Sequence, residues 1–235
     1  MKLHYFLLFV FFYTAPLAAQ EEETAPVVTK PMDDPAPAKK QYYFLSPRMS
    51  VTVPHPTGNS SFKKSFVGIY EVSAGMNAFL YRGFFVGISG KTGLLKITEN
   101  KIADYNASMI FNQAGGKIGG DFYVGEMNKV VFSTALSFGK NWSRYSGLKH
   151  KDPALPPKVT SFNTTYFEPE MNIFFLIESN FGIGATVSYT IFNTHFDPYE
   201  LSLNEYSKFD SDNTGKTQFY SFGLGFYYSL IRKKK

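Results

Sequence analysis

From Tyr42 onward, apolar and polar residues alternate with a period of two, a pattern typical of β-strands and not of helices. The segment Phe181–Ile191 shows it most clearly, because large apolar residues alternate there with Gly, Thr and Ser. The segment Gln218–Leu230 repeats the arrangement. The chain is therefore predicted to be an all-β protein.

Eight segments carry this pattern, and each is long enough to cross a bilayer when tilted. The predicted strands are Tyr43–Val53, Phe66–Leu80, Phe84–Leu95, Ser108–Val124, Val130–Trp142, Thr165–Ile177, Phe181–Ile191 and Gln218–Leu230. Short turns (81–83, 125–129, 178–180) alternate with long loops (54–65, 96–107, 143–163, 193–216). In an antiparallel up-and-down barrel, all short turns then lie at one end and all long loops at the other, as in outer-membrane barrels.

Volume indicates which face of the strands points inward. The interior of an eight-stranded barrel is just wide enough for side chains to fill. The last two strands alone carry about a dozen apolar residues, too many for that space, whereas their other face carries mainly Gly, Ser and Thr. We therefore predict a transmembrane β-barrel with its apolar face toward lipid, and not a soluble barrel with an apolar cavity.

The same inward positions on the other strands carry charged side chains of both signs. We predict a charge network in the lumen, formed by Arg48, Glu71, Lys91, Lys117, Asp121, Glu168 and Glu170. Such charges would be costly on the lipid face, and opposite signs can pair inside. The network is interpreted as a structural filling of the barrel, with a narrow ion path as the alternative.

Three local features complicate the strands. Ser108–Val124 is expected to keep one register only with a break, which suggests a bulge at Gly115–Gly116. Pro47 and Pro169 each remove a hydrogen-bond donor, so we expect them at bulges or beyond the paired region.

The N-terminus has the parts of a secretory signal peptide. Lys2 and His4 precede an apolar run over Tyr5–Tyr13, and small residues follow before an expected cleavage after Ala19 or Gln20. The run is too short for a spanning helix, which needs about 20 residues. We predict a signal peptide (1–20), a periplasmic linker rich in Pro, Ala and charge (21–41), a barrel (42–231) and a basic tail (232–235).

Composition excludes several classes of function. The chain has no Cys, so disulfides, thiolate metal sites and cysteine nucleophiles are absent. The net charge is +5, but the last four residues supply most of it, and no basic stripe marks a nucleic-acid-binding face. The chain is rich in aromatic residues, with 25 Phe and 16 Tyr, which suits strands and membrane interfaces.

The last predicted strand resembles the C-terminal β-signal of outer-membrane proteins. Its pattern is polar, any, Gly, any, any, hydrophobic, any, hydrophobic, and Ser221, Gly223, Phe226 and Tyr228 match it. The chain departs from that pattern by continuing to Lys235. As a whole, residues 42–230 resemble the OmpA/OmpX-type outer-membrane β-barrel domain. The resemblance implies insertion in the outer membrane of a Gram-negative-type cell and recognition by the barrel-assembly machinery.

Other motifs favour no specific chemistry. Gly90-Lys91-Thr92 lacks the first Gly of a phosphate-binding loop, and Asp210–Gly215 lacks ligands of a calcium loop. His55, His150 and His195 are expected in long loops, without the His-x-Ser pair of small-barrel lipid A deacylases.

We therefore predict a non-enzymatic barrel with a structural or surface-interaction role, with no catalytic residue, cofactor or metal. Its expected partners are outer-membrane lipid, the assembly machinery and a surface ligand bound by the long loops. A narrow pore or a small-solute or lipid carrier is the main alternative, and a lipid-modifying enzyme is a further one.

Overall fold

The computed structural model describes residues 42–81, 83–97, 107–124, 129–148, 158–178, 180–201 and 215–232. The predicted signal peptide and linker, and parts of three predicted long loops, lie outside these residues. The long strands are β1 (Tyr42–Gly58), β2 (Phe66–Tyr81), β3 (Phe84–Ile97), β4 (Ser108–Val124), β5 (Val130–Leu148), β6 (Lys158–Leu176), β7 (Phe181–His195) and β8 (Lys216–Tyr228).

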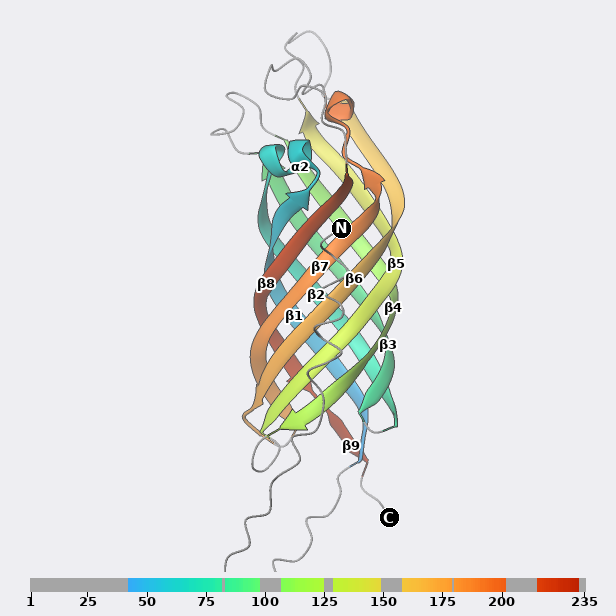
Figure 1. Ribbon diagram of the computed structural model, residues 1–235, viewed down its shortest axis with the longest axis vertical. Coiled ribbons are helices and arrows are strands. Elements are labelled where there is room, and N and C mark those ends of the chain that lie inside the picture. The colour runs from blue at the N-terminus through green and yellow to red at the C-terminus, as the bar shows by residue number, and fades with distance from the viewer. Residues whose placement is uncertain are drawn as a thin grey trace, which may run out of the picture. The chain divides into compact units, whose positions relative to one another are not determined.

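The eight strands form a closed antiparallel barrel. Each strand pairs with the next along the chain, and β1 pairs with both β2 and β8, which closes the sheet (Figure 1). A short strand β9 (Leu230–Arg232) follows β8 after Ser229 and pairs with the first residues of β1. This confirms the predicted eight-stranded up-and-down topology.

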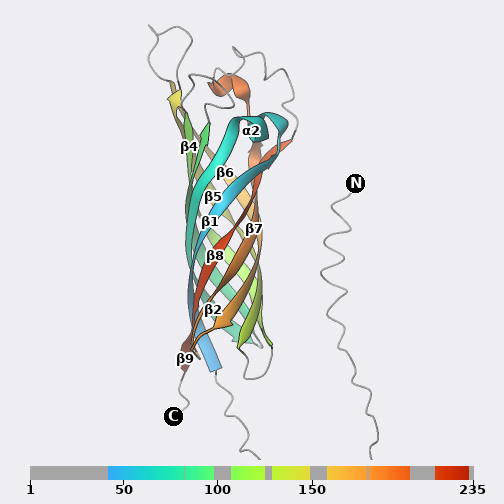
Figure 2. The same ribbon diagram turned by 90° about the vertical axis from the view of Figure 1, so that its left-hand side faces the viewer.

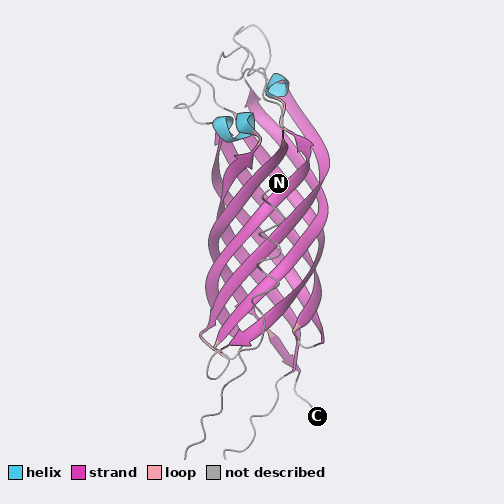
Figure 3. Ribbon diagram, viewed as in Figure 1, coloured by secondary structure: helices cyan, strands magenta, loops and turns pink. Residues whose placement is uncertain are grey.

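The strand ends that border the predicted long loops and those that border the predicted short turns lie at opposite ends of the barrel. Gly83, in the short turn between β2 and β3, has a positive φ of 86°, which suits glycine in such a tight hairpin. At the loop end lie the short helix α2 (Ser60–Ser65) and the 3-10 helix η2 (Pro198–Leu201), coloured cyan in Figure 3. Figure 2 shows the tilted strands from a second side.

Several strands extend further toward the loop end than the sequence predicted. β1 continues to Gly58, β5 to Leu148 and β7 to His195, and β6 already begins at Lys158. His55 and His195 therefore lie on strands, so their prediction as loop residues was wrong, while His150 lies outside the described residues. At the loop end, strand pairing continues past the part of the barrel wall whose outward residues are apolar. The alternation of apolar and polar residues, which marks a strand in the sequence, is lost there.

The predicted bulge in β4 does not occur. Its pairing with β3 and with β5 runs through Gly115 and Gly116 without a register shift. Inward positions simply change from apolar residues near the loops to Gln113, Lys117 and Asp121 further down. The apparent break in the pattern is thus a change in the chemistry of the interior and not in the backbone.

The two strand prolines are accommodated without bulges. Pro169 pairs in register with Leu136 of β5, and the pairing of β6 with β7 skips residues 168 and 169 before resuming in the same register. Pro47 pairs in register with Met76 of β2, and its other side faces the interval between β8 and β9. The expectation of bulges or unpaired ends was therefore wrong, because each missing donor falls at a local gap in one ladder.

The outer wall of the barrel is apolar over most of its height. Exposed side chains there include Met49, Val51, Val86, Ile88, Ile118, Leu136, Phe138, Met171, Phe222 and Leu224. None of the described helices is long and apolar enough to cross a membrane. The exposed apolar wall matches the surface that a membrane-spanning barrel presents to lipid.

Candidate functional site

The inward faces of the strands define the candidate site. The structure places all seven of the predicted lumen charges inside the barrel and brings opposite signs together. Their arrangement divides the lumen into a central ionic layer, an arginine site nearer the short turns and an aromatic region beneath the loops.

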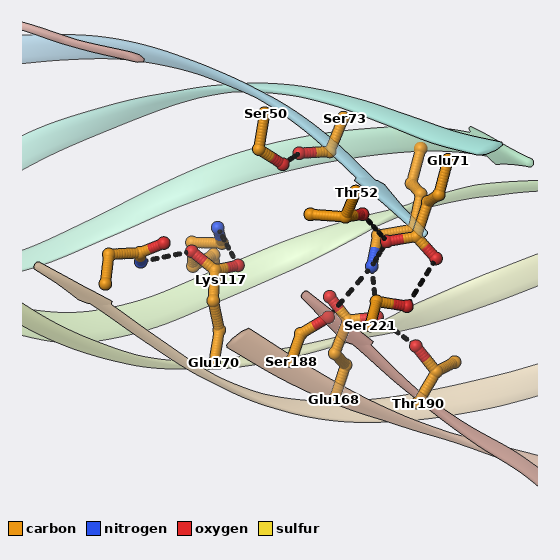
Figure 4. Close-up of polar contacts among 12 residues, drawn as sticks. Ser50, Thr52, Glu71, Ser73, Lys117, Glu168, Glu170, Ser188, Thr190 and Ser221 are labelled. Carbon is orange, nitrogen blue, oxygen red and sulfur yellow. Dashed lines mark hydrogen bonds and ion pairs between the residues drawn. The ribbon is translucent and has the colours of Figure 1, made fainter. Parts of the chain in front are cut away.

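Lys91 is the centre of the ionic layer. Its Nζ lies 2.9 Å from Glu71 Oε1 and 2.6 Å from Glu168 Oε2, and its side chain is only 8% exposed. Glu71 belongs to the neighbouring strand β2, whereas Glu168 reaches Lys91 from β6 across the lumen (Figure 4). One ammonium group thus links strands from different sides of the barrel.

Hydroxyl groups complete the coordination of these two carboxylates. Thr52 donates to Glu71 Oε1 at 2.8 Å, and Ser221 donates to Glu71 Oε2 at 3.1 Å. Thr190 donates to Glu168. These donors come from β1, β7 and β8, so the buried anions have partners on several strands (Figure 4). Hydrogen bonds of this kind are what make buried charges tolerable.

A second ion pair lies beside the first. Lys117 Nζ lies 2.7 Å from Glu170 Oε2, and Asn172 donates to Glu170 Oε1 at 2.7 Å. Ser50 and Ser73, whose hydroxyl groups are 2.6 Å apart, add a neutral contact between β1 and β2. Figure 4 shows both groups of contacts.

Arg48 forms the third charged site, nearer the short turns. Its guanidinium lies 2.5 Å from Asp121 Oδ2 and donates to Ser133 Oγ at 2.6 Å. The same group lies over three aromatic rings, at 5.0 Å from Phe85, 5.2 Å from Tyr227 and 5.8 Å from Phe174. A planar guanidinium can make ionic and ring contacts at once, which an ammonium group does less well.

The free space left between these groups is small. A cavity of about 20 Å³ is lined by Lys91, Gln113, Lys117, Glu168 and Glu170, among other residues. That volume holds about one or two water molecules. Along this part of the barrel, side chains therefore fill the interior.

Beneath the loops, the lumen is closed by a cluster of buried aromatic residues, which we call the aromatic plug. The plug consists of Phe62, Phe66, Phe111, Tyr145, Tyr166, Phe192, Phe196 and Phe219, packed with Leu95, Ile97, Ala107, Met109 and Leu201. Ring centroids lie 5.2 Å apart for Phe111 and Phe219 and 5.3 Å apart for Phe62 and Phe66. The plug is a packed apolar core at the loop end.

One buried residue, Asn59, holds the top of the plug together. Its Oδ1 accepts a hydrogen bond from Phe62 N at 3.0 Å, which caps helix α2. Its Nδ2 donates to the carbonyl oxygens of Phe196 and Gly215, each at 3.3 Å. Three segments far apart in sequence therefore meet at this side chain.

The sequence interpretation missed the plug, because it assigned the large apolar residues to the outer wall. Two signals were present. Phe111, Phe192 and Phe219 occupy inward positions in strand register, and Gly93 pairs with Phe111 at a point where a Cβ on Gly93 would overlap the Phe111 ring. A glycine opposite an inward aromatic residue marks the space that the ring fills.

The other predicted residues occupy separate places. Ser221 and Gly223 of the predicted assembly signal lie on the inward face of β8, and Phe226 and Tyr228 on its outer face. Gly90 and Thr92 lie on the outer face of β3 while Lys91 points inward, and the sequence 210–214 lies outside the described residues. The two described histidines make local contacts at the loop end. His195 Nδ1 lies 2.8 Å from the Gly215 carbonyl oxygen, and the His55 ring stacks on the Tyr220 ring with 5.0 Å between the centroids.

Within the described residues, no group of three or more His, Asp or Glu side chains is arranged to hold a metal ion. The site is a network of buried ion pairs sealed by an apolar core.

A closed barrel with an apolar outer wall and charged residues inside belongs to the transmembrane β-barrels of the outer-membrane kind. The protein is a small eight-stranded barrel of this class, and its location is the outer membrane.

No protein-family model matches the chain, and no curated protein matches it. Similar solved structures include Neisserial surface protein A (TM-score 0.49, 9% identity), covering 79% of this chain and 97% of that chain. Ail of Yersinia pestis has a TM-score of 0.42 and 13% identity, covering 79% and 99%. The outer membrane protein AlkL has a TM-score of 0.43 and 10% identity, covering 92% and 99%.

Proposed function

We propose that this protein is a non-enzymatic, non-conducting barrel that anchors its long loops at the cell surface, in a structural or surface-interaction role. The observation that supports this proposal is the filled lumen. Ion pairs occupy its centre, the aromatic plug occupies the loop end, and the cavity among the charged side chains measures only about 20 Å³. A barrel filled in this way is rigid and offers solutes no open path.

The test is conductance across a planar bilayer that contains the purified, folded protein. We expect no steady current steps, because an ion would have to displace the plug and the paired charges. An open porin in the same membranes serves as a positive control. Steady steps in the wild-type protein would overturn the proposal.

A narrow pore is the second candidate, since charged side chains line the cavity in the centre of the lumen. The network contains three cations, Arg48, Lys91 and Lys117, and four anions, Glu71, Asp121, Glu168 and Glu170. The excess of one anion would favour cations in a conducting state. Current steps with cation selectivity that change on Glu71→Gln would support this candidate over the first.

A lipid-modifying activity has a separate test. The lipid A mass profile of cells is compared with and without the protein. We expect an unchanged profile, and a modified lipid A species that appears only with the protein would establish an enzymatic role.

Recognition by the barrel-assembly machinery is proposed for strand β8. Phe226 and Tyr228, on the outer face of that strand, are 38% and 39% exposed and lie at the hydrophobic positions of the signal pattern. The double variant Phe226→Ala and Tyr228→Ala should reduce the amount of folded protein in the outer membrane. Phe222→Ala, an exposed aromatic position of the same strand outside those two pattern positions, is the matched control.

A further inference from the structure

We infer that the outer wall of the barrel carries a binding site for a phosphorylated glycolipid of the outer leaflet, centred on Trp142. This inference concerns the wall formed by β4, β5 and β6, which lie side by side in Figure 1. It does not depend on whether the lumen conducts.

The site lies where the apolar belt ends on the loop side. Strand pairing aligns outward-facing residues of the three strands in rows. From the belt toward the loops, the rows are Gly116–Phe138–Phe167, Ala114–Lys140–Thr165, Asn112–Trp142–Asn163 and Ile110–Arg144–Ser161. On β5, the first cationic outward residue is Lys140, which directly follows the outward residue Phe138 of the apolar wall.

Chemistry within these rows suits a phosphorylated sugar. Lys140 and Arg144 are exposed cations on either side of Trp142, which is 46% exposed. Asn112 and Asn163 pair with Trp142 from both sides and are exposed. Cations bind phosphate, amides bind sugar hydroxyl groups, and an indole ring provides a flat apolar face at the membrane interface.

Charge complementarity points to an anionic partner. Among the described outward-facing residues of β3, β4, β5 and β6, none is Asp or Glu. Lys96 on β3 adds another exposed cation near the same end. Lys140 and Arg144 have no carboxylate partner in the described part of the chain.

The opposite wall shows that this patch is local. At the loop end of β8 and β1, outward positions include Tyr220, Phe222 and His55, and the His55 ring stacks on each of the other two. That wall presents mainly aromatic residues together with Lys216, where the Trp142 wall presents two cations and two amides. The rows around Trp142 thus place these cations and amides beside one indole ring, whereas Lys216 of β8 lies on the strand face that carries Tyr220 and Phe222.

The place of the Trp142 patch at the loop end of the barrel indicates which leaflet supplies the lipid. This end faces the outer leaflet in an outer-membrane barrel with short periplasmic turns. The cations Lys140 and Arg144 are four residues apart on one strand, about 13 Å between their Cα atoms. A disaccharide lipid with a phosphate on each sugar would span the indole and reach both cations.

The test uses Trp142 as its own reporter, because it is the only Trp in the chain. Bisphosphorylated lipid A is titrated into the folded full-length protein in zwitterionic detergent micelles, and the Trp142 emission is recorded. We expect a saturable change. The variant K140Q/R144Q should weaken binding at least about tenfold, because it removes both charge-assisted contacts.

The matched control is K64Q/K216Q, which removes two exposed lysines at the same end but outside the patch. This control should bind like the wild type. Migration on an unheated denaturing gel verifies that each variant is folded, and all four positions face away from the lumen. Equal affinity in both double variants would overturn the inference. An equal saturable response to phosphatidylglycerol would also overturn it, since the wall would then recognise charge and not a phosphorylated sugar.

Discussion

The central ionic layer and the aromatic plug occupy the same lumen, yet they fill it by different physical means. Around Lys91, each charge has a partner of opposite sign and hydroxyl donors from several strands. Around Phe111, rings pack against rings, with centroids 6.0 Å away for Phe192 and 5.2 Å away for Phe219. A buried ion pair is costly to break but contributes little net stability, whereas apolar packing contributes directly. The comparison suggests that the ionic layer determines which strands face one another, and that the plug stabilises the loop end.

The largest effect is expected from Lys91→Met. This change leaves Glu71 and Glu168 buried without a cation, and breaking a buried pair in this way costs about 3–5 kcal/mol. Denaturant unfolding of the protein in lipid vesicles, followed by Trp142 fluorescence, measures the loss. Lys140→Met, at an exposed position, is the matched control and should change the free energy of unfolding by less than about 0.5 kcal/mol.

The triple variant K91M/E71Q/E168Q tests the cause. It removes the uncompensated anions along with the cation, so most of the lost stability should return. A triple variant as unstable as K91M alone would show that the shape of the Lys91 side chain, and not the charge balance, holds the layer together.

A loss of similar size is expected from Phe111→Ala, which opens a cavity in the plug. Replacing a buried Phe in this way costs about 3 kcal/mol or more. Phe138→Ala, at a lipid-facing position of the neighbouring strand, is the control and should cost clearly less, because lipid tails can fill the space. Equal losses in the two variants would mean that the plug is not packed as a core.

The sequence predicted the ionic layer far better than the plug, and the reason is physical. Side chains along a strand point alternately inward and outward, so the sequence pattern alone could place Lys91 and Glu168 in the lumen. That these two side chains pair depends on strand tilt and stagger across the barrel, which local sequence does not encode. Phe192 and Phe219 also lie at inward positions of the same alternation, but the volume argument assigned large apolar residues to the outer wall and so overrode this signal.

Helix α2 was missed for a related reason. Its six residues, Ser60–Ser65, are too few to show a helical period, and they lie in a segment that was predicted to be a loop. The signal that remains is Asn59 as an N-cap, which becomes informative only once its other contacts are known.

Arg48 makes both an ion pair, with Asp121, and contacts with aromatic rings, so its variants can separate the two contributions to stability. Arg48→Lys keeps the positive charge near Asp121 but loses the planar group that covers Phe85 and Tyr227, and we expect a loss of about 1–2 kcal/mol. Arg48→Met also removes the charge and should cost more, because Asp121 then lacks its cation. The same unfolding measurement ranks the two variants, and equal losses would show that ring contacts, and not the ion pair, dominate at this site.

The smallest effect is expected at the top of the plug, from Asn59→Ala. Loss of the cap on α2 and of the two hydrogen bonds to Phe196 and Gly215 should cost about 1–2 kcal/mol. Asn193→Ala, at an exposed position of β7, is the control. Asn59→Asp separates the two roles, since it keeps the acceptor for Phe62 N but removes the amide donor.

The position of cleavage then distinguishes local from global effects in these Asn59 variants. Limited proteolysis of the folded protein should cut Asn59→Ala near α2 earlier than the wild type, while the ionic layer keeps the barrel closed. If Asn59→Asp behaves like Asn59→Ala, the donor to the Phe196 and Gly215 carbonyls is the important contact, and Asn59 joins the loops together more than it caps the helix. If Asn59→Asp instead behaves like the wild type, the cap alone is sufficient to hold Phe62 in the plug.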